Sequence, residues 1–121
     1  MGLTTRASFD KFYDNTATVS PCSNTGVVVK ASSGAVYQVE VDNTINAGSA
    51  VYLRIFDLAA APTITSVEPE HLIPVAAGQK LVMSTVDGLP CGTGITVACT
   101  TTANLAGTAP TGTVTVRIGY T

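Results

Sequence analysis

The chain has 121 residues, which is the length of a single ordinary domain. Only 12% of its residues are Asp, Glu, Lys or Arg, about half the roughly 25% of an average soluble domain, while 45% are hydrophobic. The net charge of −2 and the scattered Lys and Arg residues exclude a nucleic-acid partner, and no apolar run approaches the roughly 18 residues of a membrane helix.

The low charge has two interpretations. A small sandwich with a Thr-rich surface would show it, and so would a domain whose surface is covered in an oligomer or larger assembly. We favour the assembly, because so few charges leave a lone monomer poorly protected against association.

Residues 1–25 show no regular alternation and hold three of the seven aromatic residues. We expect this N-terminal segment either to cap one end of the domain or to act as an arm that docks on a neighbouring subunit. Its candidate partner-binding residues are Arg6, Phe9, Lys11, Phe12 and Tyr13.

Residues 26–121 form the predicted domain, because strand signals repeat from residue 26 onward. The clearest half-buried strand is 35–42, where Tyr37, Val39 and Val41 are predicted to share one face. In the strand predicted at 51–57, bulky residues occupy both faces, so we expect partial cover on both sides. Further strands are predicted at 27–29, 64–67, 71–75, 79–85, 95–101 and 114–120.

Turn signals separate these strands. Pro74 places its strand at a sheet edge or a bulge, and Asp87-Gly88 predicts a turn. No stretch has helical periodicity. The predicted fold is therefore all-β, an antiparallel β-sandwich of seven or eight strands and of jelly-roll or immunoglobulin-like type.

The residues that could carry chemistry are few. His71 is the only imidazole for nucleophilic catalysis, and we interpret it as an edge residue bonded to a neighbour. Glu68 and Glu70 form the nearest carboxylate pair, interpreted as a solvated strand end. Residues 88–94 resemble a phosphate-binding loop but lack the following Lys and helix. We predict no catalytic site and no cofactor.

The three cysteines, Cys22, Cys91 and Cys99, make an odd number without a CxxC pair, so neither a disulfide framework nor a zinc site is predicted. We interpret them as small buried hydrophobic residues in a reducing compartment. A bridge between Cys91 and Cys99, which flank one predicted strand, remains open.

Residues 34–43 and 50–57, together with 74–79, 87–89 and 94–98, resemble a group of small bacteriophage virion proteins. The resemblance lies in strand and turn pattern and covers residues 26–121. It implies a non-enzymatic β-sandwich that decorates or cements a capsid, or belongs to a tail or fibre, commonly as a homotrimer.

The implied partner is the major capsid protein or another virion protein, with no nucleic acid and no membrane. Because residues 1–6 lack the apolar core of a signal peptide, we expect assembly in the host cytoplasm and a final location in the virion. Two alternatives stay open. One is a carbohydrate-binding module, and the other is an enzyme whose active site is shared between subunits, with His71 and Glu70 as its candidate catalytic residues.

Overall fold

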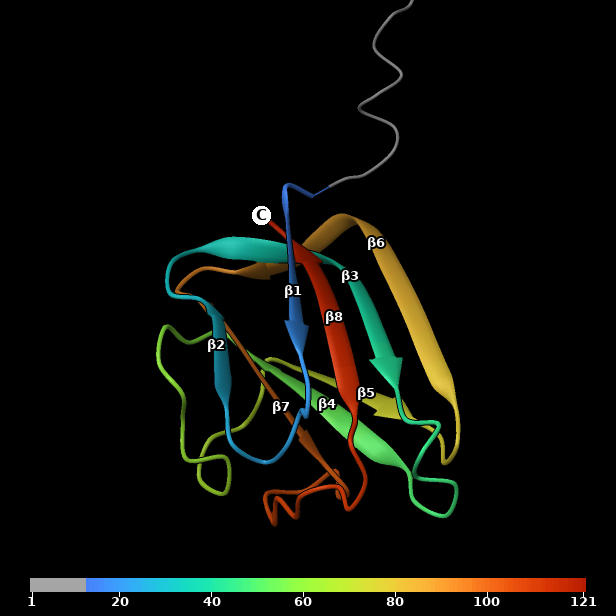
Figure 1. The fold of residues 1–121 in the computed structure, drawn as a ribbon. Coiled ribbons are helices and arrows are strands. Elements are labelled where there is room, and N and C mark those ends of the chain that lie inside the picture. Colours follow the sequence, from blue (N-terminus) through green and yellow to red (C-terminus); the bar gives the residue numbers. More distant parts are fainter. Residues whose placement is uncertain (1–12) are drawn as a thin grey trace, which may run out of the picture.

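Figure 1 shows a computed structural model of the chain, which describes residues 13–121. The described residues form eight β-strands and no helix, which confirms the all-β prediction. The strands are β1 (Asn15–Val19), β2 (Val27–Lys30), β3 (Gly34–Asp42), β4 (Val51–Phe56), β5 (His71–Val75), β6 (Lys80–Cys91), β7 (Ile95–Thr100) and β8 (Thr115–Tyr120).

The strands form two antiparallel four-stranded sheets, ordered β1-β8-β3-β6 and β2-β7-β4-β5. The two sheets lie face to face, as in a β-sandwich (Figure 1). Strand pairing follows a simple rule: β1 pairs with β8, β2 with β7, β3 with β6 and β4 with β5. The chain is thus arranged as one long hairpin, closed between β4 and β5 and rolled up so that β3 meets β8 and β4 meets β7.

The core lies between the sheets and consists mainly of valine and isoleucine. Alternate residues of β3, β4, β7 and β8 point inward, as the period of two predicts. Branched side chains suit such a layer, because they pack well on a pleated surface. The inward-facing residues of these four strands are Val36, Val39, Val41, Val51, Leu53, Ile55, Ile95, Val97, Cys99, Val116 and Ile118.

A bulge corrects the predicted face of Tyr37. The pairing of β3 with β6 and β8 shifts between Val36 and Gln38, so Val36 takes the core position and Tyr37 stays half-buried. Opposite this bulge β6 passes through Asp87-Gly88 without ending, so the turn predicted there is wrong. Gly88 has a φ of 77°, and this left-handed backbone serves a bend within a strand instead of a chain reversal. Figure 1 shows β3 and β6 bending together over the same end of the sandwich.

The sandwich also begins before residue 26. Strand β1 is the edge of its sheet, and Val19 and Cys22 are buried in the main core. The edge position predicted for the Pro74 strand is confirmed, since β5 is the last strand of its sheet. The edge strand predicted at 64–67 is wrong, because these residues form a turn whose Ile64 packs on Phe56.

The second face of β4 is covered, as its sequence predicts. Arg54 points away from the core yet is fully buried. Its Nε donates to Thr100 Oγ1 at 3.0 Å, and its Nη atoms donate to the carbonyl oxygens of Ile64, Thr102 and Asn104. The arginine thereby fastens two loops, 57–70 and 101–114, to the outside of the sheet.

Candidate functional site

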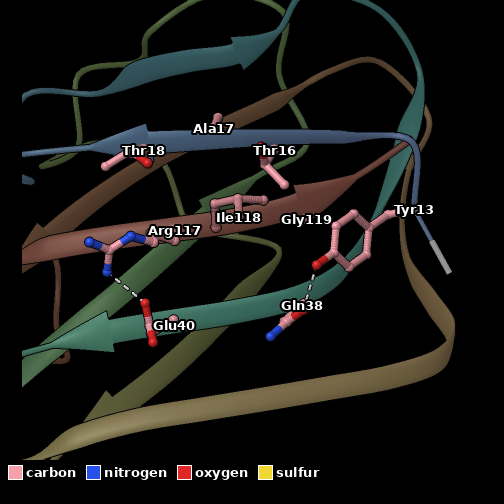
Figure 2. Close-up of a pocket in the computed structure, with 9 residues that line it drawn as sticks. All are labelled: Tyr13, Thr16, Ala17, Thr18, Gln38, Glu40, Arg117, Ile118 and Gly119. Carbon is pink, nitrogen blue, oxygen red and sulfur yellow. Dashed lines mark hydrogen bonds and ion pairs between the residues drawn. The ribbon is translucent and has the colours of Figure 1, made fainter. Parts of the chain in front are cut away.

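A hollow of about 250 Å³ lies on the outer face of the β1-β8-β3-β6 sheet (Figure 2). It is formed where the first and last strands meet beside β3. We call it the outer-sheet hollow and define it by its lining residues, Tyr13, Thr16, Ala17, Thr18, Gln38, Glu40, Arg117, Ile118 and Gly119.

Tyr13 forms the aromatic wall of the outer-sheet hollow. Its hydroxyl donates to Gln38 Oε1 at 2.7 Å, as Figure 2 shows. Its ring rests on Gly119 of β8. A Cβ placed on that glycine would lie 2.7, 2.7 and 2.8 Å from three consecutive ring atoms. Such equal distances place the glycine beneath the ring face, so any side chain at this position would push the ring away.

Glu40 forms the charged wall of the outer-sheet hollow, between two cations from the neighbouring strands. Arg117 Nη1 lies 2.6 Å from Oε2, and Lys80 Nζ lies 3.1 Å from Oε1. The hydrogen bond from Arg117, followed by that from Lys80, lowers the pKa of the Glu40 carboxyl. The carboxylate is therefore ionised and held at both oxygens, although the two cations themselves are about half exposed.

The backbone amides of the glycine-containing loop, which resembles a phosphate-binding loop, hydrogen-bond to the carboxylate of Asp57 in the same chain. Its Oδ1 accepts the backbone N–H of Thr93 at 2.7 Å and of Gly94 at 3.2 Å. These bonds, led by that from Thr93, lower the pKa of Asp57. The loop amides thus fix the connection between β6 and β7 to the end of β4.

His71 opens β5 and is half-buried. Its Nε2 is buried and finds no hydrogen-bond partner among the described residues, which corrects the predicted bond to a neighbour. Glu68 and Glu70 are exposed. Within residues 13–121, no three His, Cys, Asp or Glu side chains gather in a way that could hold a metal ion.

The three cysteines are buried and free, so no Cys91–Cys99 bridge is formed. Cys99 instead neighbours Cys22: its thiol pKa is raised by the hydrogen bond with Cys22 and by burial. A backbone hydrogen bond also places the two cysteines close together, because the Cys99 N–H donates to the carbonyl oxygen of Ser23, the residue after Cys22, at 2.8 Å. Burial also raises the pKa of Cys91 to about 11.

Of the five predicted partner-binding residues, Arg6, Phe9, Lys11 and Phe12 lie outside the described residues, and Tyr13 lines the outer-sheet hollow. Sequence reasoning missed Gln38, Glu40, Arg117 and Gly119 as members of one site. Alternation did place Gln38 and Glu40 on the polar face of their strand, but nothing in the local pattern put β8 and β1 beside them.

No helix capable of crossing a bilayer occurs in the described part of the chain. Comparisons with protein-family models, with curated proteins and with solved structures found no match to this chain.

Proposed function

We propose that this chain is a virion structural protein without enzymatic activity, a capsid decoration protein that binds between capsomers as a homotrimer. The observation that carries the proposal is the strand pairing, β1–β8, β2–β7, β3–β6 and β4–β5. This pairing supports a jelly-roll sandwich over an immunoglobulin-like one, because a jelly roll is an eight-stranded hairpin rolled into two sheets. Jelly rolls are common in viral capsid proteins and in lectins.

The surface also supports a role in assembly. Strand β6 is a sheet edge that pairs only with β3 among the described strands, so one row of its backbone groups is open to another chain. Two of its valines are strongly exposed, Val82 at 55% and Val86 at 73%, and Ile45 in the β3–β4 loop is 66% exposed. A strand edge with exposed valines and few charges favours contact with other subunits.

The test is whether the protein is part of purified particles, and at what stoichiometry. Quantitative mass spectrometry of virions is expected to find it in fixed ratio to the major capsid protein. Light scattering is expected to give three times the 12.3 kDa of one chain. A strict monomer at high concentration that also fails to bind capsids would rule out the decoration role. Presence in isolated tails and absence from heads would assign it to the tail or fibre instead.

The N-terminal arm can be tested separately, and β1 fixes where to cut. Because Asn15–Val19 belongs to the sheet, a deletion of residues 1–25 would remove an edge strand and the buried Cys22. Deleting residues 1–12 leaves the described sandwich intact. Loss of particle binding with an unchanged fold would identify residues 1–12 as a docking arm, whereas unchanged binding would place the contact on the sandwich.

A further inference from the structure

We propose that the outer-sheet hollow binds a pyranose unit of a glycan. The inference goes beyond a role in assembly, since it assigns a small-ligand site to the face built by β1, β8 and β3. It rests on three features: an aromatic ring presented by its face, fixed polar groups beside it, and the size of the space.

The first feature is the ring of Tyr13. Gly119 lies beneath one face of this ring, so the opposite face points away from the sheet. The sheet below and the bond from the Tyr13 hydroxyl to Gln38 together hold the ring in one orientation. A flat, partly exposed ring of this kind suits the C–H face of a pyranose, which is the apolar side of an otherwise hydroxylated molecule.

The second feature is the set of polar groups. Sugar hydroxyls donate and accept hydrogen bonds, and planar side chains that bond two adjacent hydroxyls suit them best. The hollow offers three such planar groups, the amide of Gln38, the carboxylate of Glu40 and the guanidinium of Arg117. Figure 2 shows them in a row along β3 and β8, with the Thr16 and Thr18 hydroxyls on β1.

These groups are already placed before a ligand arrives. Glu40 is bonded to Arg117 and to Lys80, and Gln38 is bonded to Tyr13. Gln38, Glu40 and Arg117 project from paired strands, so binding would order few side chains. The charges of Arg117 and Lys80 are offset by the carboxylates of Glu40 and of nearby Asp42, so the ligand needs hydroxyl groups more than a charge of its own.

The third feature is volume. The hollow measures about 250 Å³, slightly below the roughly 300–1,000 Å³ of sites that enclose a drug-sized ligand. It is therefore suited to one sugar ring, with the rest of the glycan lying along the open sheet face. One ring in a shallow site implies weak binding by each copy, which several copies on one particle would strengthen.

The experiment is saturation-transfer NMR on the full-length protein with methyl pyranosides of glucose, galactose, mannose and N-acetylglucosamine. Binding by at least one of them is expected, with transfer strongest at the ring protons. In a ¹H–¹⁵N spectrum the same sugar is expected to shift the backbone amides of Gln38, Glu40 and Gly119.

Three variants identify the contact. Tyr13→Ala removes the ring and is expected to weaken binding about tenfold. Tyr13→Phe keeps the ring and loses only the hydroxyl, so its affinity is expected to stay within about threefold. Tyr52→Ala on the outer face of the other sheet is the matched control, with unchanged binding expected.

Two results would overturn the proposal. One is the absence of saturation transfer from the folded protein to every sugar, even at tens of millimolar ligand. The other is binding whose shifts fall away from the hollow or persist in Tyr13→Ala. If the hollow amides shift on protein dilution or on deletion of residues 1–12, and no sugar moves them, the occupant is a segment of this chain instead. Virion stoichiometry is measured independently, so the two proposals can fail separately.

Discussion

Substituting Arg54 is the sharpest test of how the structure holds its long loops. Arg54 is fully buried in β4, and none of its hydrogen-bond partners within residues 13–121 is a carboxylate. Its guanidinium instead serves three carbonyl oxygens, one from the 57–70 loop and two from the loop after β7. A buried charge without a counter-ion is tolerated because its N–H groups are met by oriented dipoles.

Arg54→Met keeps the apolar stem of the side chain and removes its hydrogen-bond donors. The expected loss of stability follows from the acceptors that are left without a donor. A buried acceptor deprived of its partner costs about 1–3 kcal/mol. Four acceptors are affected, the three carbonyls and Thr100 Oγ1, but two of the carbonyls lie in partly buried contacts where water can replace the donor. We expect a loss of about 4 kcal/mol, a large part of the roughly 5–15 kcal/mol that stabilises a typical domain.

Urea unfolding measures this loss. With an m-value of about 2 kcal/mol/M, the midpoint should fall by about 2 M. Arg117→Met is the matched control, because Arg117 is half exposed and its ion pair with Glu40 should contribute less than about 1 kcal/mol. Hydrogen exchange should also rise at the amides of Ser66 and Thr101, which close turns in the two loops. If Arg54→Met were no less stable than Arg117→Met, the bonds to the loops would contribute little and the reasoning would fail.

Three further predictions concern the reactivity of the thiols, the stability of the protein at acid pH, and the glycine under the Tyr13 ring. The buried thiols should resist both alkylation and oxidation by glutathione disulfide at neutral pH until unfolding, because both reactions need an accessible thiolate, and mass spectrometry of the treated protein would show this. Because folding lowers the pKa of Glu40, ionised Glu40 stabilises the folded state. This stabilisation is fully present above the ordinary pKa of 4.5 and is lost as the pH falls through the lowered pKa of the folded protein. Stability measured by urea titration should therefore decline below about pH 4.5, and less steeply in Glu40→Gln. Gly119→Ala should destabilise by about 1–3 kcal/mol in the same assay, since its Cβ would meet the ring, while Gly48→Ala, with nothing within 4 Å, should not.

The strands could be predicted because their signal is local. Alternation alone located β3, β4, β7 and β8 closely. Bulky residues on both faces of β4 indicated that both of these faces are covered by other parts of the chain. Errors arose where a local signal has two structural uses. Asp87-Gly88 is a turn sequence, but a glycine with positive φ also lets a strand bend, and only the paired bulge in β3 distinguishes the two uses. Strand β1 was missed because Asn15–Val19 is mostly exposed and carries almost no apolar alternation.

The outer-sheet hollow could not be predicted, for a topological reason. Tyr13 and Gly119 are separated by almost the whole chain, and they meet only because β1 pairs with β8. Glu40 reaches Arg117 through the β3–β8 pairing, which joins the middle of the chain to its end. No local pattern encodes these neighbours, because they depend on the order in which the strands are rolled.

The same topology makes the hollow a marker of the completely folded state. Its walls come from the first, third and last strands, so it exists only after both ends of the rolled hairpin have paired. Contacts between residues so far apart in sequence form against a large loop-closure entropy, which makes folding of such sheets slow. Any intermediate in which β1 has not reached β8 would leave Gly119 uncovered and Tyr13 away from Gln38. The bond between Tyr13 and Gln38 and the site where we place the ligand therefore both depend on the pairing of β1 with β8 and of β8 with β3.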